Sequence, residues 1–533
     1  MELNTKNICI VAILVSAILF ILMLLYVWNF TVDDAFISFV YGKHLASGFG
    51  LVWNIGQPPV EGYTNFLWVL IIAFLFFLKL DPIISTKVIG LLSVFGIIVL
   101  FWFITNDIFR NKKNKYIAFT VSTIFLLINP YTAIHAVSGL ETMFYTFLLL
   151  GVVYSAWKII MFHNSKFIWL FAFTALLLSL TRPEGILISL GLIFSIIYIS
   201  YKKNNNSINL TSFIPILILY LVPIMIYMIF RVSYFHELLP LPFLVKTVYG
   251  NSFYTISYLI LFLEYIAPFI IIILISFFKT YQRTESREMR KKTDLEYFLF
   301  TLFVAFILAN IVYFFTELVM NYSQRFFYPS FILVYVSFGI AISILFNEIR
   351  NKLNVKLLKN TIPIMVCSFI VVLLLISNAS FLTDLKIYHD YGNDLNATHI
   401  TLGKALNSYS MDNYTFASGD AGAITYFSKW HQLDIGRLND KFIAENGGAT
   451  LEYVEKTNPE LVILYSPSLP TNSSDLSHEQ PFYNFVLENN YIQLDPIKFN
   501  ENYYLIPFLK PNIKDFESIK DSIETVSKES NEN

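Results

Sequence analysis

The sequence predicts a polytopic α-helical membrane protein that carries a small α/β domain at its C-terminal end. Of the 533 residues, 56% are hydrophobic, 17% are aromatic and only 14% are charged. About 25% of the residues in an average soluble domain are charged, and a soluble globule has too little interior to bury so much apolar surface. The apolar residues gather in long runs, and the composition becomes polar from about residue 379. Most of the chain is therefore expected to lie in a membrane.

Charge and cysteine content exclude several other classes of protein. The formal net charge is −1, and the basic residues lie in short loops, so a nucleic-acid-binding protein is not indicated. The two cysteines, Cys9 and Cys367, both lie inside apolar runs. This placement rules out a disulfide framework and a cysteine-ligated zinc site.

About eleven apolar runs are interpreted as membrane-spanning helices, which need roughly 20 mostly apolar residues each. No small-residue cleavage site follows the first run, 7–28, so we expect a retained helix rather than a signal peptide. The other spans are expected at 88–106, 116–134, 142–162, 167–180, 186–201, 210–230, 253–278, 296–315, 330–346 and 361–378. Together they make residues 1–378 a transmembrane module.

Lys and Arg residues indicate the orientation of these helices, because they concentrate in cytoplasmic loops. The most basic loops are 110–115, 279–292 and 350–359, so the N-terminus is expected inside and the chain after residue 378 outside. The apolar run 66–80 has 15 residues, which reach only about 22 Å, against a hydrocarbon core of about 30 Å. We therefore expect an interfacial helix within a first outer loop, 29–87.

The polar remainder predicts a separate extracytoplasmic α/β domain over residues 379–514. Helix-like and strand-like segments alternate there, for example LEYVEKTNPE at 451–460 and LVILYS at 461–466. Residues 515–533 are charged and poor in apolar side chains, so we expect a disordered tail.

The first outer loop contains the most informative polar residues. Asp33 and Asp34 follow the first apolar run, at the expected boundary between membrane and water. Partial desolvation and the neighbouring like charge both raise a carboxylate pKa and make a better proton acceptor. The alternative is structural, because Asp34 is also suited to cap a helix that begins at Ala35. Spacing alone leaves both interpretations open.

A series of motifs over residues 31–440 resembles a known enzyme family. The motifs are DDAFIS (33–38), GFGLVWNIG (48–56), VEGYTNFLW (60–68), SGLETMFYTFLL (138–149), LTRPEG (180–185), RVSYFHELLPLPFLVK (231–246), QRFFYP (324–329), GDAGAITYFS (419–428) and LDIGRLND (433–440). In this order they resemble membrane glycosyltransferases of the GT-C fold. The nearest resemblance is to the terminal arabinofuranosyltransferases of mycobacterial type and their uncharacterised bacterial relatives.

The resemblance implies an enzyme that moves a sugar from a polyprenyl-phosphate donor to an acceptor hydroxyl of a cell-envelope glycan or lipid. The sugar would be a pentose such as arabinofuranose, or a hexose, and the active site would face outward from the plasma or inner membrane. The family's acidic pair matches Asp33 and Asp34, one of which would be the general base. Its second acidic position matches Glu141, for which a helix cap before Thr142 is the alternative. A single displacement by a base-activated hydroxyl would invert the anomeric centre.

A leaving polyprenyl phosphate needs cationic partners, and Arg forks and Lys serve best. Four basic residues of the outer loops fall within the motifs: Arg325, Lys246, Arg231 and Arg182. All four are candidates to bind the donor phosphate: we expect this contact for Arg325 and Lys246, whereas for Arg231 and Arg182 phosphate contact and a structural role stay equally open. The alternatives are a snorkelling side chain at a helix end and, for Arg182, an ion pair with Glu184.

Other polar residues of the motifs have two interpretations each. Asn54, Glu61 and Tyr63 in the first outer loop either hold sugar or acceptor hydroxyls or order the loop. In the outer domain, which is expected to bind the acceptor, Asp420 and Asp434 are interpreted as cap and turn residues.

No metal or other cofactor is expected. The sequence has neither a DxD motif nor an HxxxH spacing, and its eight His residues are scattered. His44 and His135 are interpreted as hydrogen-bonded loop residues. Expected partners are the lipid-linked donor, the acceptor and membrane lipids.

Two functions of other classes stay open at this point. One is a transporter or flippase of lipid-linked saccharides, although transporters place polar residues near the membrane midplane, often in repeats. The other is an inactive scaffold that binds a glycan through the outer domain.

Overall fold

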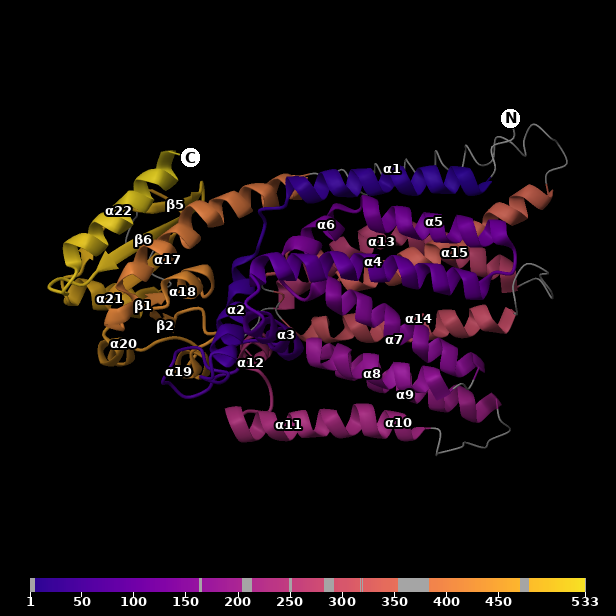
Figure 1. Cartoon of the computed structure of the whole chain (residues 1–533), viewed down its shortest axis with the longest axis horizontal. Helices are drawn as coiled ribbons and strands as arrows, with labels where there is room; N and C mark the ends of the chain where they lie inside the picture. The colour runs from indigo at the N-terminus through magenta and orange to yellow at the C-terminus, as the bar shows by residue number, and fades with distance from the viewer. Residues whose placement is uncertain are drawn as a thin grey trace.

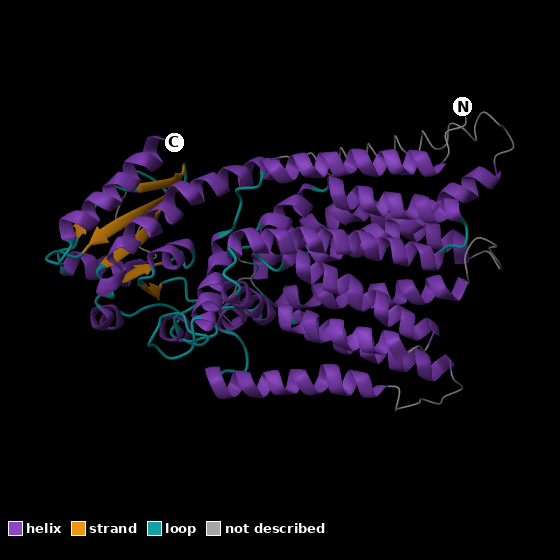
Figure 2. Ribbon diagram, viewed as in Figure 1, coloured by secondary structure: helices purple, strands orange, loops and turns teal. Residues whose placement is uncertain are grey.

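The structure, a computed structural model, describes residues 5–162, 165–203, 213–248, 252–281, 292–316, 318, 320–352, 383–469 and 479–532. It consists of a bundle of long helices and a smaller domain at one end of that bundle (Figure 1). Among the described residues, strands occur only in the smaller domain (Figure 2). The predicted division into a helical module and a C-terminal α/β domain is confirmed.

Eight helices in the described part of the chain are long and apolar enough to cross a membrane. They are α1 (Thr5–Tyr26), α4 (Pro82–Ile108), α7 (Thr142–Phe162), α9 (Glu184–Lys203), α13 (Ser252–Tyr281), α14 (Lys292–Ile311), α15 (Tyr328–Lys352) and the segment formed by α10 (Ile214–Ile216), η2 (Leu217–Leu221) and α11 (Val222–Phe235). A shorter apolar helix, α8 (Ser165–Thr181), accompanies them. The predicted span 361–378 lies outside the described residues, so the total of about eleven stays a prediction.

The run 116–134, expected as one span, is bent. α5 (Lys112–Ile128) and α6 (Pro130–Val137) meet at an angle of 63°. The side-chain oxygen of Asn129 accepts a hydrogen bond from the amide of Tyr131 at 2.9 Å, while Pro130 has no N–H to continue the α5 ladder. The Asn-Pro pair therefore ends one helix and starts the next.

Many large apolar side chains on the outside of the helix bundle are exposed. Val11, Leu14 and Ile18 on α1, Phe95 on α4 and Phe194 on α9 are each more than half exposed. A continuous surface of this kind is stable against lipid and not against water. The chain is therefore a polytopic membrane protein.

Residues 29–87, the predicted first outer loop, contain two helices that pack against each other at the end of the bundle where the C-terminal domain lies, α2 (Asp33–Ala46) and α3 (Phe66–Phe77) (Figure 1). α3 has 12 residues, about 18 Å of helix, which is too short to cross a bilayer. Its expected position in the outer membrane face stays a prediction.

The C-terminal domain, named the outer domain after its predicted position, is built on a six-stranded sheet of order β2-β1-β3-β6-β4, with β5 paired to β6. β1 (Thr415–Ser418) runs parallel to β2 (His431–Asp434) and β3 (Leu461–Ser466), whereas β6 (Tyr503–Leu509) is antiparallel to β3, β4 (Ile492–Gln493) and β5 (Ile497–Asn500). Its helical segments are 383–395, η5 (Asn396–Ile400), α17 (Thr401–Leu406), η6 (Asn407–Asp412), α18 (Ala423–Ser428), α19 (Lys441–Glu445), α20 (Leu451–Thr457), α21 (Gln480–Glu488) and α22 (Phe516–Glu532).

The expectation of a disordered tail at 515–533 is wrong. Residues Phe516–Glu532 form α22. Ile519, Ile523 and Val526 on one face of this helix are fully buried in the outer-domain core, together with residues of β3, β5 and β6. Composition alone obscured this, because a few apolar residues spaced four and three apart suffice to make one buried face on a charged helix.

Candidate functional site

Both acidic residues of the first outer loop lie in the first turn of α2. The helix begins at Asp33, its N-cap is Val32, and no side chain caps it. Asp34 is therefore not the cap of a helix that starts at Ala35. The amide of Val32 donates a hydrogen bond to the carbonyl of Ser138 at 3.1 Å, which fixes this turn next to the second acidic motif.

Asp33 is buried against the outer domain. Its Oδ1 accepts a hydrogen bond from the amide of Ala423 at 2.8 Å. Its own amide donates to the hydroxyl of Tyr391 at 3.2 Å. Burial raises the pKa of Asp33 to about 7. A carboxyl group with this pKa is a stronger base than an ordinary aspartate, but one of its oxygens is already occupied.

Asp34 has different surroundings from its neighbour. It is half-buried, and within the part of the chain that the structure describes it forms no hydrogen bond or ion pair. Its charge acts on Tyr322, whose pKa is raised to about 12 mainly by burial and to a smaller extent by Glu141 and Asp34. The ring of Tyr322 lies 5.9 Å from the guanidinium of Arg325. Asp34 is thus a carboxylate without a hydrogen-bond or ion-pair partner among the described residues, and its charge acts on Tyr322, the neighbour of the buried Arg325.

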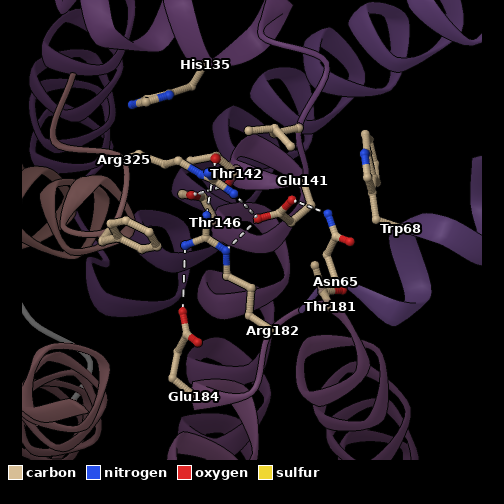
Figure 3. A network of polar contacts seen from close by, with 12 residues as sticks. Asn65, Trp68, His135, Glu141, Thr142, Thr146, Thr181, Arg182, Glu184 and Arg325 are labelled. Carbon is tan, nitrogen blue, oxygen red and sulfur yellow. Dashed lines mark hydrogen bonds and ion pairs between the residues drawn. The ribbon is translucent and has the colours of Figure 1, made fainter. Parts of the chain in front are cut away.

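Glu141 lies at the centre of a buried ion network (Figure 3). Its Oε1 accepts hydrogen bonds from Arg182 Nε at 2.7 Å and from Arg325 Nη2 at 3.2 Å, and its Oε2 accepts one from Asn65 Nδ2 at 2.8 Å. Burial alone would raise the pKa of Glu141, but the two guanidinium groups hold it at about 2. Glu141 is therefore ionised. It directly precedes α7, and its carbonyl accepts a hydrogen bond from the amide of Tyr145 at 2.8 Å, but the expectation that it is exposed is wrong because it is only 1% exposed.

The SGLET motif positions Glu141 through its glycine. Gly139 has a φ of +82°, and a Cβ at this position would lie 2.9 Å from the Cβ of Ala35 on α2. Its carbonyl accepts a hydrogen bond from Trp68 Nε1 on α3 at 3.1 Å. Glycine meets both demands, a left-handed backbone and close approach to α2.

The predicted pair of Arg182 and Glu184 exists but is secondary. Arg182 Nη1 lies 3.6 Å from Glu184 Oε1, which is longer than its contact with Glu141. Glu184 instead accepts a hydrogen bond from the hydroxyl of Tyr313 at 2.5 Å.

Several buried polar atoms around this network have no partner. Within the described residues, Arg325 Nε, the hydroxyl of Tyr145 and Nδ1 of His135 form no hydrogen bond. The ring of Tyr145 lies 5.1 Å from the guanidinium of Arg182. Because buried polar groups are normally paired, the donors of Arg325 and Tyr145 are available to the oxygen atoms of a ligand. Nδ1 of the neutral His135 ring can only accept, because Nε2 donates to the carbonyl of Ser323.

The remaining predicted cations lie elsewhere. Arg231 on α11 pairs with Glu61 through Nε and Oε2 at 2.9 Å and through Nη2 and Oε1 at 3.2 Å. Lys246 lies in the last turn of α12 (Leu241–Val248), and its contact with a phosphate stays a prediction.

Two of the three predicted sugar-contacting residues of the first loop are occupied by protein partners, whereas the buried hydroxyl of Tyr63 has no partner among the described residues. Asn54 exchanges two hydrogen bonds with the backbone of Gln432, at 2.9 and 3.0 Å, and Glu61 is occupied by Arg231. Tyr63 packs against Tyr41 with their ring centroids 4.7 Å apart. The structure thus favours a role in ordering the loop for Asn54 and Glu61, and sugar contact by Tyr63 stays a prediction.

In the outer domain, Asp434 has the expected role of a turn residue, whereas Asp420 binds two side chains. Asp434 accepts hydrogen bonds from the amides of Gly436, Leu438 and Asn439, as a turn residue does. Asp420 instead binds His399 Nε2 at 2.9 Å and the hydroxyl of Tyr503 at 2.8 Å.

His399 is a candidate site residue that sequence analysis missed. Its pKa is raised: burial opposes its charged form, but the hydrogen bond and the charge of Asp420 outweigh it, helped by Asp33. A single histidine in a polar segment has no neighbouring sequence pattern that would identify it as a site residue. The GDAG motif that contains Asp420 was the one feature that could have directed attention to this place.

The two histidines considered as metal ligands are hydrogen-bonded to backbone carbonyls. His44 Nδ1 lies 2.9 Å from the carbonyl of Val52, and His135 Nε2 lies 3.0 Å from that of Ser323. Among the described residues, no group of three or more His, Cys, Asp or Glu side chains is arranged to hold a metal ion. Metal independence nevertheless stays a prediction.

Comparison with known proteins identifies the fold. Residues 388–519 match a family described as a domain of unknown function (DUF8728), and no curated protein matches the chain. ArnT from Cupriavidus metallidurans bound to undecaprenyl phosphate superposes with a TM-score of 0.55 at 10% sequence identity, over 93% of this chain and 97% of ArnT. ArnT in its apo state gives a TM-score of 0.52 at 12% identity, over 96% and 98% of the two chains. The chain has the GT-C fold.

Within this GT-C fold, four separate sequence motifs meet at one place. The SGLET, LTRPEG and QRFFYP motifs supply Glu141, Arg182 and Arg325, and VEGYTNFLW supplies Asn65 (Figure 3). The DDAFIS motif of α2 lies beside them through the contact between Val32 and Ser138.

Stability is expected to fall as the pH rises from about 4 to about 7. Burial raises the pKa of Asp33, Asp434 and Glu479 to about 7 each, against roughly 4 in an unfolded chain. The folded state then holds protons that the unfolded state has lost, so the stabilisation is complete below about pH 4 and is lost as the pH rises through about 7. Glu141, with its lowered pKa, acts in the opposite sense below about pH 4.5. Burial also lowers the pKa of His44 and His431, so these two residues oppose the fall up to about pH 6.5, but the three carboxyl groups have the larger shifts.

Thermal unfolding of the purified protein in lipid, followed by tryptophan fluorescence, measures this dependence. Glu479→Gln should flatten the profile because it removes one of the three titrating groups. A midpoint that rises steadily over this pH range would contradict the expectation.

Proposed function

We propose that this protein transfers a sugar from a polyprenyl-phosphate donor to a hydroxyl of a cell-envelope acceptor. The proposal is supported by the GT-C fold, shared over almost the whole chain with ArnT bound to undecaprenyl phosphate. The observation that carries it is a carboxylate without a hydrogen-bond or ion-pair partner among the described residues, Asp34, whose charge acts on Tyr322, while the ring of Tyr322 lies 5.9 Å from the guanidinium of Arg325.

The reaction is a single displacement at the anomeric carbon. The acceptor oxygen forms a bond to this carbon while the bond from the carbon to the phosphate oxygen breaks, and the phosphate leaves with the electron pair. Asp34 takes the proton of the acceptor hydroxyl as general base. Attack from the side opposite the phosphate inverts the anomeric centre.

Arg325 is the proposed partner of the leaving phosphate. Its Nη2 is held by Glu141, while its Nε has no partner among the described residues. A guanidinium group held in this way presents its remaining N–H donors in a fixed direction, which suits an oxyanion that gains charge in the transition state. Arg182, which is bound more closely to Glu141, supplies a second positive charge nearby.

The ion network explains how two arginines are kept buried before the donor binds. Glu141 neutralises one charge, and Glu184 lies 3.6 Å from Arg182. Without a donor the network is balanced, with two carboxylates facing two guanidinium groups. A phosphate would add acceptors to the unpaired donors of Arg325 and Tyr145. Lys246 and Arg231 stay secondary candidates for phosphate contact.

Release of free polyprenyl phosphate tests the proposal. Purified protein in lipid vesicles is incubated with a panel of polyprenyl-phosphate pentoses and hexoses, with a membrane fraction offered as acceptor. We expect release from one donor class, dependent on the acceptor fraction. No release from any donor by the folded protein would overturn the proposal and favour transport or a glycan-binding scaffold.

A further inference from the structure

The outer domain contacts the first turn of α2 through the loop that contains the GDAG motif. α18 packs on α2 (Figure 1), and the amide of Ala423 donates its hydrogen bond to Asp33 Oδ1 at 2.8 Å. On the other side, the hydroxyl of Tyr391, from helix 383–395, accepts a hydrogen bond from the amide of Asp33 at 3.2 Å. Two segments of the outer domain therefore hold a single residue.

The approach of the two backbones at this contact leaves no room for a side chain. A Cβ at Gly422 would lie 2.3 Å from Asp33 Oδ2 and 2.4 Å from the Asp33 carbonyl oxygen. The second of these atoms belongs to the backbone, so it cannot turn away as a flexible side chain could. The final glycine of the GDAG motif is thus required by the contact with Asp33.

The rest of the motif is held by the outer domain itself. Asp420 is bound by His399 at 2.9 Å and by Tyr503 at 2.8 Å, and Gln432 donates to the carbonyl of Asp420 at 2.9 Å. The loop therefore meets Asp33 as a rigid unit.

We propose that Asp33 is a positioning residue: it locks the outer domain onto α2 and so fixes the direction in which Asp34 points. Asp33 has one oxygen bonded to Ala423, and Gly422 packs against the other, whereas Asp34 forms no hydrogen bond with a described residue. In this proposal the two aspartates have different roles. Asp33 fixes the position of the outer domain on α2, and Asp34 is the general base. The kinetic part of this inference depends on the proposed function, whereas the docking part does not.

The docking part is tested by hydrogen exchange of the amides in residues 419–428, measured by mass spectrometry on the full-length protein in lipid. Asp33→Leu should raise their exchange rate by about 10- to 100-fold, the factor that corresponds to losing a hydrogen bond to a charged group. Asp33→Asn should keep most of the protection, because its amide oxygen still accepts from Ala423. Gly422→Ala should behave like Asp33→Leu, and Gly448→Ala is the matched control because a Cβ there meets nothing within 4 Å.

The kinetic part is tested with the same variants. Asp33→Leu and Gly422→Ala should lower kcat for sugar transfer by about tenfold or more with little change in KM for the donor, because the donor phosphate is bound at Arg325 and a misplaced base slows only the chemical step. Gly448→Ala should leave both constants unchanged.

Unchanged exchange in both Asp33→Leu and Gly422→Ala would overturn the docking role. Faster exchange with an unchanged kcat would overturn the positioning role. If the wild-type protein transfers no sugar, the proposed function fails, and the exchange measurement still decides whether Asp33 holds the domain.

Discussion

Asp34→Asn is expected to lower kcat for sugar transfer by about 10²- to 10⁴-fold, the usual contribution of a general base. The asparagine has nearly the same shape but cannot take the acceptor proton. The fold should be unaffected, because Asp34 forms no hydrogen bond or ion pair with a described residue. Initial rates of polyprenyl-phosphate release at saturating donor measure the effect.

Asp495→Asn provides the matched control for this substitution. Asp495 is an exposed carboxylate of the outer domain, so its loss should leave the rate within about twofold of wild type, as is usual for surface substitutions. If Asp34→Asn also retained nearly full activity while its thermal midpoint stayed at the wild-type value, another group would have to be the base.

Glu141→Gln is expected to destabilise the protein by about 3–5 kcal/mol, as removal of one partner from a buried ion pair commonly does. Arg182 and Arg325 would each keep a buried positive charge without the carboxylate that now accepts their hydrogen bonds at 2.7 and 3.2 Å. A loss of this size is a large fraction of the 5–15 kcal/mol that typically separates folded from unfolded protein. Denaturant or thermal unfolding in a fixed lipid composition measures it.

Two further variants distinguish this mechanism from a general effect of removing charge. Glu455→Gln on α20 removes an exposed carboxylate and should change stability by less than about 0.5 kcal/mol. The double variant Glu141→Gln with Arg325→Gln should recover part of the loss, because it leaves one buried cation instead of two. Strictly additive losses would show that Glu141 and Arg325 are not coupled.

The membrane module could be predicted from the chain because lipid imposes a simple rule. A segment that crosses a bilayer must be apolar over roughly 20 residues and must satisfy its own backbone, which a helix does. The long runs that became α1, α4 and α7 meet this rule without reference to their neighbours. The bend between α5 and α6 depends on a single Asn-Pro pair. The helix α22 depends on the spacing of three apolar residues. An average of composition over a long segment detects neither feature.

The ion network could not be predicted in the same way, since its members come from distant parts of the chain. Glu141 and Arg325 are 184 positions apart, and Glu141 and Arg182 are 41 apart. Arg182 and Glu184 are two positions apart, so the sequence suggests that they pair. In the folded protein, however, Arg182 lies closer to Glu141 than to Glu184. The packing of the surrounding helices decides which carboxylate an arginine binds. Burying both charges costs free energy, and only a short ion pair whose other hydrogen bonds are also made offsets that cost.

Hydropathy, loop charge and the order of the motifs were thus enough to predict a polytopic membrane protein of GT-C type, an α/β outer domain and an acidic pair at the start of α2. The separate roles inferred for Asp33 and Asp34 required the tertiary structure. Consecutive residues on a helix point about 100° apart, so neighbours in sequence face different surroundings. Asp33 faces the GDAG loop of the outer domain, whereas Asp34 is left uncommitted near Tyr322 and Arg325. A local pattern cannot distinguish the two, because the surroundings of each are brought there by residues hundreds of positions away.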